Sequence, residues 1–497
     1  MNILTLRAPA ILAAAALLLA GCASLTVPDT TPLSPAQLSP PGSEAISTGG
    51  YRLTSMAAAQ DSPDLMVLVA LSGGGKRSSA YSYGVLKGMR DILVPTAAGP
   101  RPLLDQVDGI SGISGGSFTA AYYGLHREAT FGRFEEDFLY RDTNANVWGI
   151  YLLPWNWGWV INPMVGTNDY MAEVYDRTLF KGAHFDALAQ RGRPLIVIGA
   201  TEMSTGTEFV FSQEMFDLIC SDLEKMPVAR AVAASAAFPG LFSPVTLTNR
   251  AAECGGRKPG WLRHITKEQR RDPLSRLGAQ AAVTERYLDP DDMRYVHLTD
   301  GGVSDNLGMR MMGGMMQNLA QSPDELVARG LDRVRRILVI SVDGQAAQDV
   351  AVARQRLVGG LFQIFGLVSG AQIGRIGFET MITVNQQLQE ITRAVRVARC
   401  GRGPVIDGTP CGDVEGSLIR ISLADVPDDA KRQQLQAIPT TLTLTRQQVD
   451  MLIEAGRTGV TTSPELRQFL DAYPPRARPS ASAGGARVAA GSSRRLP

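Results

Sequence analysis

The chain has 497 residues and a formal net charge of +1, because 49 lysines and arginines nearly balance 48 aspartates and glutamates. This balance gives no electrostatic reason to expect nucleic acid as a partner. Hydrophobic residues make up 44% of the chain, which is enough for a large core. Length alone would predict about three domains, although a single large α/β domain is often longer than the usual domain length.

Residues 1–22 are predicted to form a lipoprotein signal peptide. Arg7 precedes an apolar run over 10–20 that is too short to span a bilayer but is typical of a signal-peptide core. The run ends in Leu-Ala-Gly-Cys, which resembles the bacterial lipobox, whose cysteine is acylated and becomes the mature N-terminus. By the same resemblance, Ala23 after Cys22 favours the outer membrane. An ordinary signal peptide that happens to contain a cysteine is the alternative.

Two segments have compositions that are typical of chains without a core. Residues 23–63 are rich in Pro, Ser and Thr and predict a tether between the lipid anchor and the body. Residues 474–497 predict a disordered tail. The folded body is therefore expected over 64–473, with a polar surface insertion at 249–292.

Within the body, apolar runs alternate with helical patterns. Continuous Val, Ile and Leu runs separated by helices indicate a mostly parallel sheet covered by helices on both faces, an α/β fold. Near the end of the chain, Thr445 and Gln448 have the spacing of a capping box, and Gly456 predicts the end of that helix. In chain order, the patterns predict a strand over 64–72, a helix over 81–93, and further strands over 193–203, 208–212, 295–299, 335–344 and 416–425.

Glycines follow the first strand at Gly73, Gly74 and Gly75. The surrounding residues lack both phosphate-binding patterns, G-x-x-x-x-G-K-[ST] and G-x-G-x-x-G. Three successive glycines instead leave bare N–H groups that can approach an oxyanion.

The stretch DGISGISGGS at 108–117 contains G-x-S-x-G only around Ser114, between Gly112 and Gly116. Its flanks, LLDQVD and FTAAYYGL, predict a strand, a sharp turn and a helix, the context that this nucleophile motif requires. The glycines permit a strained turn, and the helix N-terminus faces any developing anion. A flexible glycine-rich turn is the alternative.

A carboxylate is predicted at the end of the strand over 295–299. Asp300 follows that strand and precedes Gly301 and Gly302, at an edge where α/β sheets place their sites. His297 would suggest a Ser-His-Asp triad. In an extended strand, however, His297 faces the side opposite to Asp300, which argues against the triad.

Three motifs in this order, GGGKR, GISGG and DGG, resemble the patatin-like phospholipases, in particular their bacterial lipoprotein branch. The resemblance extends to ARAVAASAAFPGLFSPV at 229–245 and to IPTTLTLTRQQVDMLIEAGR near the end. It implies a patatin-like sheet related to the α/β-hydrolase fold and a serine–aspartate dyad without histidine. The resemblance also implies that Ser114 is the nucleophile and Asp300 its base.

In the same resemblance, Gly73, Gly74 and Gly75 form the oxyanion hole, and Arg77 matches the basic residue after the glycines. Ser78 departs from the glycine that is usual there, which leaves the local turn geometry in question. The implied activity is hydrolysis of phospholipid or lysophospholipid esters through an acyl-enzyme, without metal or cofactor. A thioesterase, a general esterase, an acyltransferase and a non-catalytic lipoprotein scaffold are the alternatives. The expected partners are a lipid substrate and, through Cys22, a membrane.

If Cys22 is lipidated, four cysteines remain at 220, 254, 400 and 411. An even number in an exported protein permits disulfides. Cys400 and Cys411 bracket a loop that could close easily, which would leave Cys220 with Cys254. All three pairings remain possible from the sequence.

Two further segments are unusually apolar. Residues 147–160 hold four of the five tryptophans, at 148, 155, 157 and 159, and predict either a lid or lipid-entry surface or a buried aromatic cluster. Residues 357–378 contain regular glycines and Arg375, which disfavours a spanning helix. Core packing is the preferred interpretation there, with an acyl pocket or an interfacial position as alternatives.

Overall fold

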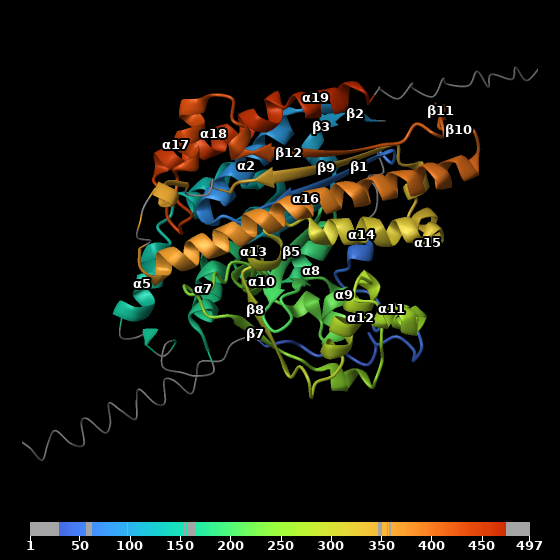
Figure 1. The fold of residues 1–497 in the computed structure, drawn as a ribbon, viewed down its shortest axis with the longest axis horizontal. Coiled ribbons are helices and arrows are strands. Elements are labelled where there is room, and N and C mark those ends of the chain that lie inside the picture. Colours follow the sequence, from blue (N-terminus) through green and yellow to red (C-terminus); the bar gives the residue numbers. More distant parts are fainter. Residues whose placement is uncertain are drawn as a thin grey trace, which may run out of the picture.

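In this computed structural model, a mixed sheet runs through the middle of the molecule with helices on both faces (Figure 1). The residues that the structure describes are 29–55, 62–96, 98–153, 156–157, 159, 165–345, 350–354, 356 and 359–473.

Five mutually parallel strands form most of the sheet: β1 (Leu65–Leu71), β4 (Val107–Ile113), β5 (Leu195–Glu202), β9 (Arg336–Asp343) and β12 (Glu415–Ser422). Three antiparallel strands extend it: β6 (Glu208–Val210), β7 (Val245–Thr248) and β8 (Tyr295–Thr299). The strand order is β12-β9-β1-β4-β5-β8-β7, and β6 pairs with β5. The predicted, mostly parallel α/β sheet is therefore confirmed.

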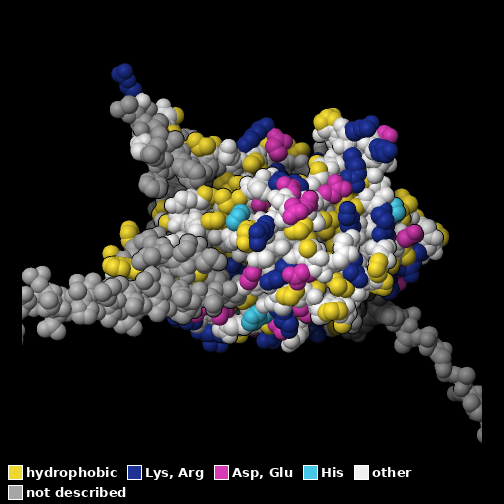
Figure 2. Space-filling model, turned by 90° about the horizontal axis from the view of Figure 1, so that it is seen from below, with side chains coloured by type: hydrophobic (Ala, Val, Ile, Leu, Met, Phe, Trp, Pro, Cys, Tyr) yellow, Lys and Arg dark blue, Asp and Glu magenta, His cyan; other side chains and the backbone are white. Residues whose placement is uncertain are grey.

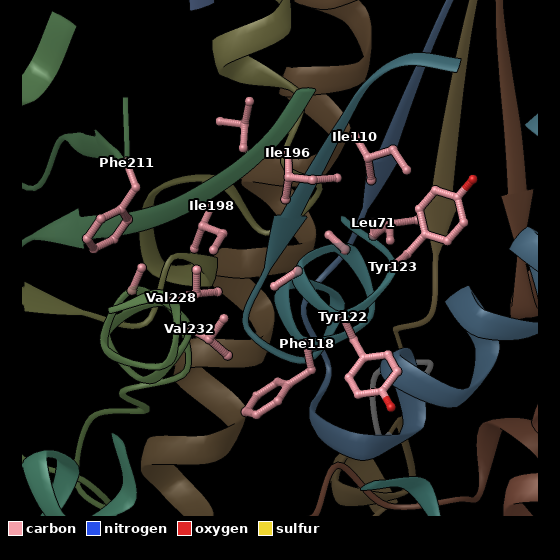
Figure 3. Packing of buried hydrophobic residues seen from close by; sticks show 14 of the residues in the cluster. Leu71, Ile110, Phe118, Tyr122, Tyr123, Ile196, Ile198, Phe211, Val228 and Val232 are labelled. Atoms are coloured by element: carbon pink, nitrogen blue, oxygen red, sulfur yellow. The ribbon is translucent and has the colours of Figure 1, made fainter. Parts of the chain in front are cut away.

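Alternate residues of β1 face two separate apolar cores. Leu65, Val67, Val69 and Leu71 join a large core that includes residues of α2 (Gly75–Asp91), α3 (Gly115–His126) and α18 (Arg446–Thr462). Figure 3 shows part of this core around Leu71 and Phe118. Met66, Leu68 and Ala70 join a smaller core with α14 (Arg310–Gln321) and α16 (Leu361–Arg402). Burial on both faces explains why the strand is apolar throughout rather than alternating.

The remaining helices surround these layers, and two small hairpins lie outside the main sheet. They are α4 (Thr130–Phe134), α5 (Asn144–Leu152), α7 (Thr167–Tyr175), α8 (Phe185–Arg191), α9 (Gln213–Leu218), α10 (Val228–Ser235), α11 (Lys267–Arg271), α12 (Arg276–Tyr287), α13 (Gly302–Asp305), α15 (Pro323–Ala328), α17 (Asp429–Gln436) and α19 (Pro464–Asp471), with hairpins β2–β3 (Leu93–Thr96, Gly99–Pro102) and β10–β11 (Val405–Ile406, Thr409–Pro410).

The capping box of Thr445 and Gln448 is present, but the predicted end of α18 at Gly456 is wrong. The helix continues to Thr462 because Gly456 serves a packing role. A Cβ added at Gly456 would lie 2.3 Å from the Tyr81 carbonyl oxygen, and one added at Gly84 would lie 2.1 Å from the Ile453 carbonyl oxygen. The two glycines allow α18 and α2 to pack backbone against backbone.

Core packing is the wrong expectation for the described side chains of residues 357–378. Val368 and Phe378 of α16 are more than half exposed, and buried large apolar side chains begin at Val384. The cause is length, since 42 residues of helix extend for about 63 Å whereas strands of seven or eight residues extend for about 25 Å. The amino-terminal part of α16 therefore projects past the sheet (Figure 1). No helix among the described residues has the length and apolar content that crossing a bilayer requires.

The expected tether over 23–63 is wrong for residues 29–55, which pack on the body. Leu33, Ile46 and Tyr51 are buried in the large core. The Tyr51 hydroxyl donates to the Ile196 carbonyl oxygen at 2.9 Å and accepts from the Ile196 N–H at 2.7 Å, which joins this segment to β5. A few buried side chains and hydrogen bonds are thus enough to order a segment that is rich in Pro and Ser.

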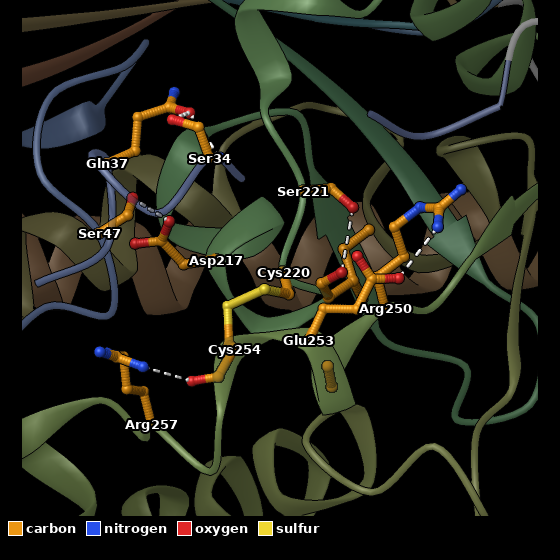
Figure 4. The surroundings of a disulfide bond; sticks show 12 residues. Ser34, Gln37, Ser47, Asp217, Cys220, Ser221, Arg250, Glu253, Cys254 and Arg257 are labelled. Atoms are coloured by element: carbon orange, nitrogen blue, oxygen red, sulfur yellow. Dashed lines mark hydrogen bonds and ion pairs between the residues drawn. A yellow bond between two sulfur atoms is a disulfide. The ribbon is translucent and has the colours of Figure 1, made fainter. Parts of the chain in front are cut away.

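Two disulfides decide between the pairings that the sequence leaves open: Cys220–Cys254 and Cys400–Cys411. The first joins the end of α9 to the insertion at 249–292, whose described elements include α11 and α12 (Figure 4). The Leu33 N–H donates to the Cys220 carbonyl oxygen at 3.2 Å, and Arg257 donates to the Ser39 carbonyl oxygen at 2.7 Å. The disulfide therefore stands beside the surface on which the amino-terminal segment lies.

Candidate active site

Ser114 occupies the sharp turn between β4 and α3, with a φ of 48° that side chains rarely adopt. Its glycine neighbours are needed for close packing. A Cβ added at Gly112 would lie 2.7 Å from the Ser117 Cα, and one added at Gly116 would lie 2.4 Å from the Leu71 carbonyl oxygen. The motif therefore builds a strained turn that projects the serine at the end of the strand.

The Ser114 hydroxyl donates a hydrogen bond of 2.8 Å to Asp300 Oδ2. Both residues are buried, with exposed fractions of 8% and 6%. The other carboxylate oxygen, Oδ1, accepts the Gly302 N–H at 2.8 Å. The structure thus brings together two side chains that are 186 positions apart in the chain, in the geometry of a nucleophile and its base.

Asp300 reaches this position from an antiparallel strand. β8 pairs with β5 only through Thr299 and Leu298, which face the last two residues of β5. The end of β8 therefore lies at the carboxyl edge of the parallel strands. A Cβ added at Gly301 would lie 2.5 Å from the Gly199 carbonyl oxygen, so only glycine permits this approach.

The electrostatic environment favours a neutral Asp300 more than water does. Burial raises the pKa of Asp300 to about 6, and hydrogen bonds from the Gly302 N–H and the Ser114 hydroxyl lower it in part. A carboxylate whose pKa approaches neutrality is a better proton acceptor than an ordinary aspartate and is still largely ionised at pH 7.

The glycine loop after β1 lies against the serine turn. A Cβ added at Gly73 would lie 3.2 Å from the Ser114 Cβ, and one added at Gly115 would lie 2.0 Å from the Gly75 carbonyl oxygen. Gly74 and Gly75 have φ angles of 137° and 59°. The two turns are in backbone contact, so the glycine loop lies directly beside Ser114.

Gly73 differs from Gly74 and Gly75 in the hydrogen bonding of its N–H group. The Gly73 N–H already donates to the Asn306 carbonyl oxygen at 2.9 Å. Gly73 therefore does not fit the role of an oxyanion donor. Of the three N–H groups that were expected to form the oxyanion hole, those of Gly74 and Gly75 remain. The first N–H groups of α3, at Gly115 and Gly116, have no acceptor within their own helix and lie at the positive end of its dipole.

The patatin-like phospholipase family model matches residues 69–312, the segment that contains the glycine loop, Ser114 and Asp300. This segment is a patatin-like phospholipase domain. The match confirms the predicted fold and the prediction that the chain carries a domain of this serine hydrolase type. The bacterial lipoprotein branch stays a prediction.

The chain is also similar to two solved structures of human GIVD cytosolic phospholipase A2. The first has 14% sequence identity and a TM-score of 0.42, with 82% of this chain and 63% of that chain covered. The second, in complex with methyl gamma-linolenyl fluorophosphonate, has 14% identity and a TM-score of 0.36, with 83% and 60% covered. The chain thus spans less than two thirds of that protein's length. No curated protein matches the sequence significantly.

Arg77 of the patatin-like domain holds the start of α2, directly after the glycine loop, in place. Its buried guanidinium donates to the Gly344 carbonyl oxygen at 2.9 Å and to the Ile438 carbonyl oxygen at 2.8 Å. Burial lowers its pKa to about 10, and the nearby Asp343 raises it in part. Arg77 therefore ties the start of α2 to two neighbouring segments.

Ser78, which replaces the usual glycine, fits without distorting the turn. Its buried hydroxyl donates to the Ser72 carbonyl oxygen at 2.6 Å. The hydroxyl of Ser72 in turn accepts the Gly344 N–H at 2.9 Å. The serine therefore adds a hydrogen bond at the end of β1 and leaves the glycine loop beside Ser114.

Sequence reasoning missed two supporting residues. The Ser235 hydroxyl accepts the Ser114 N–H at 2.8 Å and donates to the Gly199 carbonyl oxygen at 2.6 Å. Asn306 accepts the Gly73 N–H, as described above. Ser235 lies within the ARAVAASAAFPGLF stretch and Asn306 follows DGG, so their proximity to known motifs was the only available signal.

His297 lies on the exposed face of β8, as the alternation of an extended strand predicts. Its ring lies at the surface and its Nδ1 is 3.0 Å from the Thr246 hydroxyl, whereas Leu298 of the same strand is buried. The hydrogen-bond partner of this ring is thus Thr246, and a dyad without histidine stays a prediction. Within the described residues, no cluster of three or more His, Cys, Asp or Glu side chains could hold a metal ion.

Proposed function

We propose that this chain is a lipid acyl hydrolase that cleaves carboxylic ester bonds of phospholipids or lysophospholipids with a Ser114–Asp300 dyad. The observation that carries the proposal is the 2.8 Å hydrogen bond between Ser114 Oγ and Asp300 Oδ2 inside a patatin-like phospholipase domain. The strained serine turn and the adjoining glycine loop support the same assignment.

In the proposed mechanism, Asp300 removes the hydroxyl proton as Ser114 Oγ attacks the ester carbonyl carbon. The negative charge that develops on the carbonyl oxygen is stabilised by the N–H groups of Gly74 and Gly75 and by the dipole of α3. The protonated Asp300 then gives its proton to the leaving alcohol, and the acyl group remains on Ser114.

Water completes the cycle. Asp300 accepts a proton from the water molecule that attacks the acyl-enzyme, and the fatty acid leaves as the Ser114 hydroxyl is restored. Every proton step uses one carboxylate, which is why its raised pKa matters. A thioesterase or an acyltransferase would use the same first half-reaction and differ in the leaving group or the acceptor.

A fluorophosphonate probe tests the nucleophile directly. We expect the wild type to be labelled, Ser114→Ala to be unlabelled, and Asp300→Asn to be labelled much more slowly. Equal labelling of the wild type and Ser114→Ala would overturn the assignment. Release of fatty acid from phospholipid vesicles, compared with hydrolysis of a short soluble ester, then distinguishes a phospholipase from a general esterase.

We further propose that the chain is a lipoprotein of the bacterial outer membrane, anchored through Cys22. Cys22 and the whole signal peptide lie outside the described residues, as does the tail over 474–497. Mass spectrometry of the membrane fraction tests the proposal by searching for an acylated amino-terminal peptide that begins at Cys22. An unmodified mature protein in the periplasmic fraction would contradict it.

A further inference from the structure

Three long segments of the chain carry no Asp, Glu, Lys or Arg: residues 144–168, 231–249 and 357–374. Charged residues make up 20% of the whole chain, so runs of this length are unusual. The three segments are far apart in sequence and belong to different elements, around α5, around α10 and at the start of α16.

Described residues of the first two segments contact each other and the site. Asn168 Nδ2 donates to the Ala233 carbonyl oxygen at 2.8 Å, which joins α7 to α10. The loop after α10 is in direct contact with the base, because the Asp300 N–H donates to the Ala237 carbonyl oxygen at 3.0 Å. The second uncharged segment therefore contacts Asp300, and the first packs against the second.

α16 approaches the site from the other side. A Cβ added at Gly377 would lie 3.6 Å from the Leu307 side chain, which follows α13 and the DGG turn. Figure 1 shows the amino-terminal end of α16 at the same end of the molecule as α5.

Large apolar side chains are exposed on α5, on the loop after α10, on α13 and on α16. Their solvent exposure ranges from 43% to 71%. We define the apolar rim by six of them: Trp148, Leu152, Leu241, Val303, Val368 and Phe378. Figure 2 shows hydrophobic side chains at the end of the molecule where α5 and the start of α16 lie.

We propose that the apolar rim docks on a lipid bilayer and so presents Ser114 to lipid that is still in the membrane. This inference rests on the proposed function. A bilayer interface accepts tryptophan and aliphatic side chains and disfavours unpaired charge. This matches the rim, four of whose six residues lie in the uncharged segments, while Arg375 beside Phe378 is paired with Glu379 at 2.7 Å.

The start of the described chain favours the same partner. Asp29 accepts hydrogen bonds from Thr248 at 2.7 and 3.2 Å, at the end of the second uncharged segment. Cys22 is only seven positions earlier, and seven residues extend for at most ~25 Å. An acyl chain on Cys22 would therefore hold the body directly against the membrane.

The described tryptophans of this region have different roles. Trp148 is 62% exposed, whereas Trp159 packs edge-on against Tyr170 with 5.8 Å between ring centroids. The segment thus holds an exposed tryptophan and an aromatic contact, and a lid or lipid-entry role stays a prediction; Trp155 lies outside the described residues. Trp148 is the appropriate reporter for membrane contact, because its replacement leaves the packing of Trp159 in place.

Fluorescence quenching tests this contact in the full-length protein. Ser114→Ala protein, which avoids hydrolysis, is placed in phosphatidylcholine vesicles whose acyl chains carry bromine. We expect bromine to quench part of the tryptophan emission, and we expect that part to shrink when Trp148→Phe is added. Trp261→Phe, in the surface insertion, is the matched control and should leave the quenched part unchanged. An equal effect of the two replacements would overturn the docking proposal.

Kinetics provide a second test that does not depend on a tryptophan. For Leu152→Ser combined with Leu241→Ser, we expect the ratio of vesicle hydrolysis to soluble-ester hydrolysis to fall about tenfold, because apolar area is lost from the docking surface. Leu274→Ser, at an 89% exposed leucine of the insertion, should leave the ratio unchanged. An unchanged ratio in the double variant contradicts docking. Absence of hydrolysis in the wild type contradicts the proposed function, and the quenching result still decides docking.

Discussion

Carboxylates at the two ends of the parallel strands have opposite surroundings: Asp300 is buried among uncharged donors, whereas the partly exposed Asp413 is paired with arginines. At the amino ends of β1, β9 and β12, Asp413 lies 2.6 Å from Arg335 Nη2 and 2.9 Å from Arg336 Nη1, and Arg335 also lies 3.5 Å from Asp64. At the carboxyl end, Asp300 is held by the uncharged Ser114 hydroxyl and Gly302 N–H.

This difference sets the protonation of each group. Burial raises the pKa of Asp413, but hydrogen bonds from Arg335 and Arg336 outweigh burial and hold that pKa below its usual range. The pKa of Asp300, which lacks such bonds from arginine, rises to about 6. Arginines thus make a stable ionic cluster at one end, whereas uncharged donors leave a carboxylate that can take up a proton at the other.

Asp300→Asn should have the largest effect on activity. The amide cannot accept the serine proton, so we expect kcat for a soluble ester to fall by about 10³–10⁴-fold. The melting temperature should stay equal or rise, because the variant removes a desolvated carboxylate. Steady-state kinetics and thermal denaturation measure the two effects, and a variant with more than a tenth of wild-type kcat would exclude Asp300 as the base.

Arg335→Met, at the amino ends of the strands, should have the opposite pattern, a loss of stability without a loss of activity. The variant leaves the buried Asp64 without this arginine, and we expect the free energy of unfolding to fall by about 3–5 kcal/mol. At temperatures where the variant is folded, kcat should match the wild type. Urea denaturation and kinetics together test the comparison, which fails if Arg335→Met lowers kcat without lowering stability.

Gly75→Ala should weaken the site through its backbone. The φ of 59° disfavours alanine, and its Cβ would lie 2.9 Å from the Thr441 carbonyl oxygen, so the loop and its N–H donors must shift. We expect kcat to fall by about 10²–10³-fold. Gly314→Ala on α14 is the control, because a Cβ there meets no atom within 4 Å. Similar kcat values for the two variants would argue against the glycine loop as the oxyanion site.

The smallest effect is the response to pH. The dyad is active with Asp300 ionised, so kcat/KM should be constant above its pKa of about 6 and fall tenfold per pH unit below it. Folding responds with the opposite sign, since the folded state binds this proton more tightly than the unfolded state and the group's contribution to stability falls as pH rises from about 4 to about 6.

An inflection near pH 4 would mean that Asp300 is solvated in the working enzyme. Arg335→Met should not move the inflection, because the ionic cluster lies at the other end of the strands. A shifted inflection in the pH profile of Arg335→Met would show electrostatic coupling between the ionic cluster and Asp300.

Local patterns were sufficient for much of the fold and for the two side chains at the centre of the site. The strand predicted over 295–299 coincides with β8, and Thr445 caps α18 through Gln448 as expected. The turn at Ser114 could be recognised because its glycines are required by backbone angles and close packing within a few residues.

Only the tertiary structure decided which distant residues bond to, pack against or pair with these local elements. Asn306 takes the Gly73 N–H, Ser235 holds the Ser114 N–H, and Gly456 packs on α2 instead of ending its helix. Residues 29–55 fold onto the body, and two disulfides choose one pairing among three. In each case the deciding partner lies far away in the sequence, and hydrophobic periodicity and turn chemistry carry information only about neighbours along the chain.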